Sequence, residues 1–306
     1  MRIVVALGGN ALLRRGEQPD ADVQLVHVEA AAAALAPLAR EHDLVVCHGN
    51  GPQVGLLALE SDADRSLTRA YPLDALVAQT QGMIGYWLTQ ALVNAGVDRP
   101  VVALVTQVVV DEDDPAFRAP TKFIGPVYEQ AQAHQLAGAH GWTVAPDGPH
   151  WRRVVPSPLP VRLVEQATVE QLVRGGATVV CGGGGGAPVT VGPTGRLQGR
   201  EAVVDKDLTA ALLAVALRAD HLLVLTDVAA VMEGFGTPSA RPLPTLTLEQ
   251  AEGGTYPAGS MGPKVAACAQ FVRATGRPAT IGALSDAAAL LTGLAGTTVQ
   301  PPGTRS

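Results

Sequence analysis

Residues 2–10, RIVVALGGN, join an apolar run to a glycine pair, and the same combination recurs twice along the chain. LVVC at 44–47 leads into HGNG, and TVVC at 178–181 leads into five consecutive glycines. Nearly continuous apolar runs are typical of strands that are covered on both faces. In an open parallel sheet, ligands bind at the carboxyl ends of the strands. The three glycine turns therefore predict one shared site along one sheet edge.

The rest of the chain alternates between apolar runs and helical patterns. Further strands are expected at 101–110, 221–226 and 279–284. Helices are expected at 24–41, 52–60, 73–95, 207–218, 262–275 and 286–293. This alternation predicts an α/β protein with βαβ units, right-handed crossovers and a mostly parallel sheet.

One segment breaks the pattern. From about residue 112 to 160 the chain is rich in Pro, Gly, His and Trp, as in DEDDPAFRAPTKFIGP and GWTVAPDGPHWRRVVPSPLP. The segment is too long for an ordinary loop, and such segments tend to be lids or inserted subdomains. We expect a small protruding lobe there.

Composition excludes several classes of protein. The 306 residues carry a net charge of −6 without a basic stripe, so nucleic acid is not an expected partner. Cys47, Cys181 and Cys268 are widely spaced, which argues for a reducing compartment and against a disulfide or zinc framework. The N-terminus does not resemble a signal peptide, and no run of about 18 apolar residues is present. We expect a cytoplasmic protein without a membrane partner.

The glycine turns suit an anion such as phosphate, because backbone N–H groups at a following helix N-terminus are free to bind it. A single strand–Gly–Gly turn is often explained by packing alone. HGNGPQVG at 48–55 is one residue too long for the dinucleotide fingerprint, and there is no P-loop motif. The presence of three such turns favours a phosphate site.

Lysine is rare in this chain. It occurs at Lys122, Lys206 and Lys264, and the other 19 basic residues are arginine. Lysine offers a compact charge where the guanidinium group is a wide planar fork. Phosphoryl transfer needs compact charge on the oxygens of the moving group, since its catalysis is mostly positioning and electrostatics. Asp205 and Asp207 flank Lys206, either as caps of the following helix or as groups that orient the lysines.

The sequence resembles the carbamate kinases of the amino acid kinase superfamily from residue 3 to about 299. The resemblance lies in VVALGGNALL, HGNGPQVG, PLDALVAQTQGMIGY, TQVVVDEDDPAF, PTKFIGPVY, WRRVVPSP, CGGGGGAPV, EAVVDKDL, TDVAAV and GSMGPKV. It implies an open αβα sandwich that forms one domain over 1–306, with the lobe near the active site, and usually a homodimer. It also implies that ADP and carbamoyl phosphate give ATP and carbamate, with Mg²⁺ accompanying ATP/ADP.

The resemblance also implies which residues contact the substrates. The phosphate and carbamate side is assigned to Gly8, Gly9, Asn10, Gly49, Asn50, Gly51, Gly183 and Gly184. The nucleotide side is assigned to Thr226, Asp227, Met261 and Lys264. No residue is assigned as a metal ligand.

The same motifs imply the catalytic roles. Lys206 and Lys264 would stabilise charge on the moving phosphoryl group. Lys122 would reach that group from the lobe, and Asp207 would orient the lysines. Because the attacking oxygen is already anionic, His48 is expected to be structural rather than catalytic.

The chain departs from the family pattern at three positions. Ala229 stands where a second acidic residue is usual, and Met232 lies near the place of an aromatic residue. Both belong to the nucleotide side. Phe123 stands where proline is frequent, which would alter the mobility of the lobe.

Two other functions are left open by the residues themselves. An N-acylated amino acid would be an alternative acidic phosphoryl acceptor, and a nucleotide-binding sensor would need no catalysis. The apolar helix expected at 73–95 is either buried core or a subunit interface.

Overall fold

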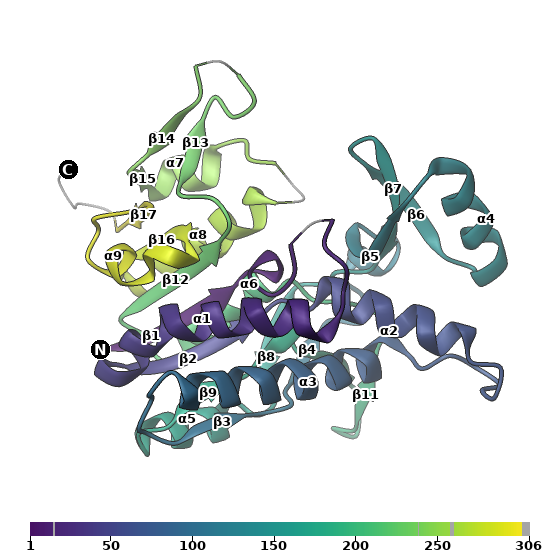
Figure 1. Cartoon of the computed structure of the whole chain (residues 1–306), viewed down its shortest axis with the longest axis horizontal. Helices are drawn as coiled ribbons and strands as arrows, with labels where there is room; N and C mark the ends of the chain where they lie inside the picture. Colours follow the sequence, from purple (N-terminus) through teal and green to yellow (C-terminus); the bar gives the residue numbers. More distant parts are fainter. Residues whose placement is uncertain (15, 238, 258–259, 302–306) are drawn as a thin grey trace.

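The computed structural model describes residues 1–14, 16–237, 239–257 and 260–301 (Figure 1). Within these residues, eight strands form the central sheet in the order β15-β17-β16-β12-β1-β2-β9-β3. Their bounds are β1 Arg2–Leu7, β2 Asp43–His48, β3 Val101–Ala103, β9 Thr178–Val180, β12 His221–Thr226, β15 Thr245–Thr247, β16 Ala279–Ala283 and β17 Thr297–Gln300. Only the β16–β17 pair of the described sheet is antiparallel. The expected α/β fold with a mostly parallel sheet is confirmed.

Helices cover both faces of this sheet, because successive side chains of each strand point to opposite faces. Along β1, Ile3, Val5 and Leu7 pack in one apolar cluster, while Val4 and Ala6 pack in the other. The first cluster is covered by α1 Ala21–Glu41, α3 Leu73–Asn94 and α9 Ala287–Leu291. The second is covered by α5 Gln166–Arg174, α6 Lys206–Ala216, α7 Leu248–Gly253 and α8 Met261–Thr275. The result is the αβα sandwich that the resemblance implies.

The strand expected at 101–110 is wrong as a single element. It splits into β3 and β4 Gln107–Val110, and β4 belongs to a second sheet of order β11-β10-β4-β8. The break occurs at Thr106, whose backbone N–H and C=O both bond to the side chain of Gln81 at 3.0 Å. The remaining strands of that sheet are β8 Pro160–Leu163, β10 Ala187–Val191 and β11 Leu197–Gly199. The side chain of Gln81 therefore takes the place of one backbone partner at this point, while Thr106 C=O also accepts from the N–H of Ala187 at 2.9 Å and so leads into the second sheet.

The helices lie close to their expected positions, with one clear difference. The helix expected at 286–293 is shorter, since α9 ends at Leu291 and Gly293 has a φ of +73°. A small antiparallel pair, β13 Val231–Glu233 and β14 Arg241–Leu243, follows β12. None of the described helices is long and apolar enough to cross a membrane.

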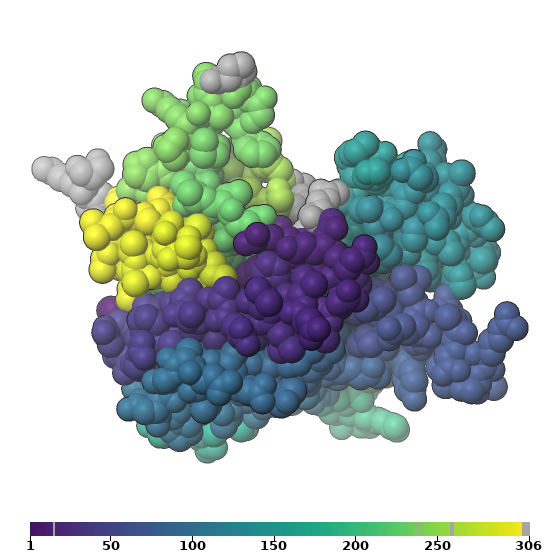
Figure 2. Space-filling model, viewed as in Figure 1, coloured from purple at the N-terminus to yellow at the C-terminus, as the bar shows by residue number. Residues whose placement is uncertain are grey.

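Within the region expected to protrude, residues 122–155 form an antiparallel sheet of order β5-β7-β6 with one helix against it. Its elements are β5 Lys122–Tyr128, α4 Gln130–His140, β6 Thr143–Asp147 and β7 His150–Val155. We call residues 122–155 the lobe. Figure 1 shows the lobe projecting from the sandwich, and Figure 2 shows an open notch between it and the segment that carries β13 and β14.

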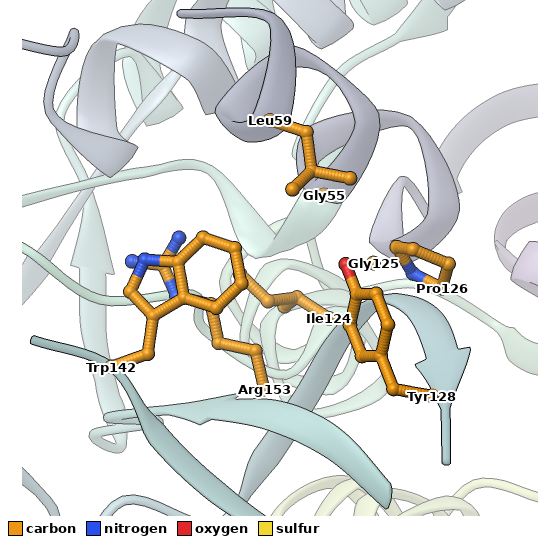
Figure 3. A pocket seen from close by; sticks show the side chains of 8 residues that line it. All are labelled: Gly55, Leu59, Ile124, Gly125, Pro126, Tyr128, Trp142 and Arg153. Carbon is orange, nitrogen blue, oxygen red and sulfur yellow. The ribbon is translucent and has the colours of Figure 1, made fainter. Parts of the chain in front are cut away.

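The lobe rests on α2 Gly51–Ala63 through a joint of two glycines (Figure 3). The backbones of Gly55 on α2 and Gly125 on β5 are so close that a Cβ on Gly55 would overlap Gly125. Gly125 has a φ of +70°, which favours glycine. Around the joint, the guanidinium carbon of Arg153 lies 4.7 Å from the ring centre of Trp142. This contact limits the positions that are available to Lys122, the first residue of β5.

A substitution at this joint tests the contact between the lobe and α2. Gly55→Ala is expected to destabilise the protein by about 1–3 kcal/mol, because the added methyl group must push the lobe off α2. Hydrogen exchange of β5 should become faster, as measured by mass spectrometry, and urea unfolding should report the loss of stability.

The matched control is Gly138→Ala on α4. Gly138 is exposed and has open space around it, so this change should stabilise the protein by about 0.5–1 kcal/mol. Wild-type exchange of β5 in Gly55→Ala would contradict the described joint.

Candidate active site

The glycine turns lie at neighbouring positions of the sheet edge. β12, β1, β2 and β9 are adjacent and parallel, so the residues after them emerge at the same edge. The first two turns are held to their neighbours by the backbone: Gly8 N–H donates to Leu225 at 2.9 Å, and Gly49 N–H donates to Leu7 at 3.0 Å. The three glycine turns, which follow β1, β2 and β9, therefore lie at one edge as expected, together with Thr226 at the end of β12.

The three lysines form ion pairs with two aspartates. Asp207 accepts from Lys206 Nζ at 2.6 Å through one oxygen and from Lys264 Nζ at 3.0 Å through the other. Asp205 accepts from Lys122 Nζ at 2.5 Å. The lysines come from the first residue of α6, the first turn of α8 and the first residue of β5. Three segments that are far apart in sequence thus supply one cluster of ammonium groups.

The cluster is buried, and its charges depend on one another. Asp205, Lys206 and Asp207 are each at most 8% exposed. Burial works against the charge of Asp207, but the ammonium groups of Lys206 and Lys264 outweigh it and hold its pKa below its usual value. In the same way Lys122 and Lys206 overcome the burial of Asp205 and keep its pKa well below its usual range. Both aspartates are therefore anionic at neutral pH.

The pKa values of Lys206 and Lys264 are shifted in opposite directions. Burial lowers the pKa of Lys206, and the neighbouring ammonium of Lys264 adds to this, although Asp207 opposes both. Burial would also lower the pKa of Lys264, but Asp207 outweighs it and raises the pKa above its usual value. Each ammonium group has three donors, and the carboxylates occupy one of them. Two donors on each lysine are available to an anion.

The turn after β12 contains a second set of hydrogen-bonded polar side chains. Asp227 accepts from Asn10 Nδ2 at 2.8 Å and from the hydroxyl of Thr226 at 3.0 Å. Burial would raise the pKa of Asp227, but these two bonds and the charge of Lys264 lower it. Asn10 is thus joined to the expected nucleotide side of the site. Met261, at the start of α8, is half-buried and packs against an apolar cluster.

Gly49 and Asn50 fit closely into the same region. A Cβ on Gly49 would lie 2.8 Å from the backbone nitrogen of Gly9 and 3.4 Å from Lys206 Cε. Asn50 is buried, and its Nδ2 donates to Thr80 at 2.8 Å. Gly51 begins α2 and has open space at its Cβ position. Within the turn formed by Gly49, Asn50 and Gly51, free space is thus found next to Gly51.

The five-glycine run is buried, and protein atoms lie against it. A Cβ on Gly183 would overlap the ring of His48, and one on Gly184 would overlap the amide of Asn50. Gly184 also has a φ of +62°. Close packing therefore explains why side chains are absent here, which the sequence analysis had attributed to a ligand. A contact of Gly183 or Gly184 with substrate stays a prediction.

His48 fits a structural role. Its Nδ1 lies 3.0 Å from the carbonyl oxygen of Gly49. Burial lowers its pKa to about 4, and the charge of Lys206 contributes to this shift. A neutral ring at pH 7 fills the space beside the glycine run without adding charge to the cluster.

Asp205 could be expected from the sequence either to cap the helix or to orient the lysines. The structure shows that it caps α6, since Asp207 N–H donates to its Oδ1 at 2.9 Å, and that it also binds the lobe lysine. The sequence signal for a functional role of Asp205 was its place in the Asp-Lys-Asp motif at residues 205–207. The pairing with a residue 83 positions away could not be read from it. Phe123, beside Lys122, lies under the guanidinium group of Arg152 at 5.7 Å.

Comparisons with known proteins show to which family the chain belongs. Residues 1–283 match the amino acid kinase family. Carbamate kinase from Rhizobium meliloti (strain 1021) is 49% identical over 302 residues, 98% of this chain and 93% of that protein. Carbamate kinase from Giardia lamblia bound to citric acid is 38% identical with a TM-score of 0.91, over 98% of each chain. The same enzyme bound to AMP-PNP is 37% identical with a TM-score of 0.88, again over 98% of each chain. This chain therefore belongs to the amino acid kinase family and, within it, to the carbamate kinases.

Proposed function

We propose that this chain transfers a phosphoryl group between carbamoyl phosphate and ADP, giving carbamate and ATP, by a direct in-line reaction. The observation that carries the proposal is the pairing of Lys122, Lys206 and Lys264 with two buried aspartates. This pairing fixes the lysines but leaves two ammonium donors free on each of them. Such a group of donors suits a phosphoryl group whose negative charge is spread over three oxygens.

The chemistry needs no covalent intermediate and no general base. An anionic oxygen of the ADP β-phosphate attacks the phosphorus, and a new P–O bond forms. The bond between phosphorus and the carbamoyl oxygen breaks, and carbamate leaves with that electron pair. In the reverse direction, the attacking oxygen of carbamate is equally anionic. The protein's part is to orient the two anions and to offset their charge.

Gly8, Gly9 and Asn10 are assigned to the transferring phosphate because they follow β1 at the centre of the site edge. Gly49, Asn50 and Gly51 are assigned to carbamate. The open space beside Gly51 and the closeness of Gly49 to Lys206 support this placement.

The nucleotide side is assigned to the turn after β12 and the start of α8. Thr226 and Asp227 lie at the end of β12, and Lys264 lies in the first turn of α8 beside Asp207. The Giardia relative bound to AMP-PNP supports ATP/ADP as substrates. Ala229 and Met232 are, respectively, exposed and half-buried in this region.

Mg²⁺ is proposed to enter with the nucleotide and to offset charge on its phosphates. Mg²⁺ keeps several waters and binds through one or two carboxylates and phosphate oxygens rather than in an all-protein cage. Residues 1–14, 16–237, 239–257 and 260–301 contain no group of three His, Cys, Asp or Glu side chains that could hold a metal.

A homodimer is proposed through the outer face of α3 and the neighbouring sheet edge. Gly82, Tyr86 and Val93 are exposed along α3, and Tyr86 and Val93 are 59% and 55% exposed. β3 is the last strand of the central sheet on this side, and Val105 just after it is 53% exposed. Edge strands and exposed apolar side chains favour pairing with another chain. We place the protein in the cytoplasm, in keeping with three free, buried cysteines.

The proposed reaction is tested by a coupled assay. Purified protein with ADP, Mg²⁺ and carbamoyl phosphate is expected to form ATP, detected by hexokinase and glucose-6-phosphate dehydrogenase. ATP with N-acetylglutamate should give no ADP above background. Turnover of N-acetylglutamate would favour the N-acylated acceptor, and tight ADP binding without any turnover would favour the sensor.

The role of Lys206 is tested by Lys206→Ala. Removing one preorganised charge from a transition state typically lowers kcat by about 10²–10³-fold. The KM for ADP should change by less than about threefold, because the lost interaction strengthens in the transition state. Arg65→Ala, which removes an exposed cation from a loop, is the control and should retain wild-type kcat. An unchanged kcat in Lys206→Ala would remove Lys206 from the mechanism.

The proposed dimer is tested by sedimentation velocity at micromolar concentration. The wild type should sediment as a dimer, and Tyr86→Glu should sediment as a monomer because it places a charge on the proposed interface. Val26→Glu, at a 65% exposed apolar position of α1, should remain dimeric. A monomeric wild type would contradict the proposed interface.

A further inference from the structure

Asp205 has a role that the transfer chemistry above does not use. Its Oδ2 accepts from Lys122 Nζ at 2.5 Å, and its Oδ1 accepts from the N–H of Asp207 at 2.9 Å. The residue is 8% exposed. This one side chain therefore joins the lobe lysine to the first turn of the helix that carries Lys206 and Asp207.

The fold fixes the two ends of this ion pair to the same piece of backbone. Lys122 is opposite Val155 in the β5–β7 ladder. One residue further on, Pro156 accepts from the N–H of Val203 at 3.0 Å, two residues before Asp205. Residues 155–156 thus lie between the lobe lysine and the segment that ends in Asp205. Lys122 and the segment that ends in Asp205 are both joined to residues 155–156 by backbone contacts, and these contacts set the distance between Lys122 and Asp205.

A cap alone would not require this arrangement. Serine, asparagine or aspartate would each serve at the N-terminus of α6. The second oxygen of Asp205 points to Lys122, whose side chain is 32% exposed and comes from an element outside the sandwich. Lysine has a long flexible side chain, and without a partner it would spend most of its time in other rotamers.

We propose that Asp205 is a positioning residue, which holds the ammonium group of Lys122 beside the Lys206–Asp207–Lys264 cluster before substrate arrives. The inference rests on the proposed phosphoryl transfer and adds the device that keeps the lobe lysine in place. Asp205 uses one of the three donors of Lys122, which leaves two for an incoming anion. Holding a charge in place before the reaction removes the cost of orienting it during the reaction.

Two substitutions separate the charge from the cap. Asp205→Asn keeps the size and the capping oxygen but removes the carboxylate charge. It is expected to lower kcat by about 10–100-fold, less than the loss of a catalytic donor. The KM for ADP should stay within about threefold of the wild type. Asp205→Glu keeps the charge and should recover part of the lost kcat, although it is the poorer cap.

A double-mutant cycle with Lys122→Ala shows whether Asp205 acts through Lys122. In the Lys122→Ala background, adding Asp205→Asn should lower kcat by less than about threefold. Hydrogen exchange of residues 119–128 supplies a second readout. Asp205→Asn should speed this exchange in the wild-type background and leave it unchanged in the Lys122→Ala background.

Either of two results would overturn the proposal. One is an Asp205→Asn effect of equal size in both backgrounds, in kcat or in hydrogen exchange, since Asp205 would then act as a cap or on Lys206. The other is wild-type kcat and wild-type exchange in Asp205→Asn. If the wild type formed no ATP from carbamoyl phosphate, the proposed function would fail, and the exchange cycle would still decide the role of Asp205.

Discussion

The carboxylate of Asp207 lies between two ammonium groups, and the arrangement of the site depends on that contact. A buried charge is costly unless it is paired, so Lys206 and Lys264 must both stay close to Asp207. This requirement sets the first turn of α8 beside the first turn of α6. The apolar sides of the two helices pack in the same cluster, under the central sheet. The ionic contact therefore positions two catalytic candidates, and the apolar contact keeps their helices from moving apart.

The sheet supplies the other half of the site. Because β12, β1, β2 and β9 are adjacent and parallel, the turns that follow them share one edge. Those turns approach one another closely, and at Gly49 a side chain would meet both Gly9 and Lys206. The lobe adds a third element, seated on α2 through Gly55 and Gly125. Rigid supports on three sides suit a reaction whose catalysis consists mainly of positioning and charge compensation.

The sequence predicted the parts of the fold that follow from local periodicity. The buried strands and long helices are signalled by apolar runs and by 3.6-residue patterns, and the rarity of lysine pointed to Lys122, Lys206 and Lys264. Long-range contacts were not predictable in this way. The break at Thr106 depends on Gln81, a side chain 25 residues earlier. The packing of Gly183 and Gly184 against His48 and Asn50, and the pairing of Asp205 with Lys122, likewise depend on residues distant in sequence.

In the proposed reaction, three ammonium groups converge on one transferring phosphoryl group. A crystal structure with ADP, Mg²⁺, aluminium fluoride and carbamate would show this convergence, since the fluoride complex occupies the place of that group. We expect Nζ of Lys122, of Lys206 and of Lys264 each to lie within about 3 Å of a fluoride or a phosphate oxygen. A structure in which the complex is bound and any of the three lysines points away from it would rule out this arrangement.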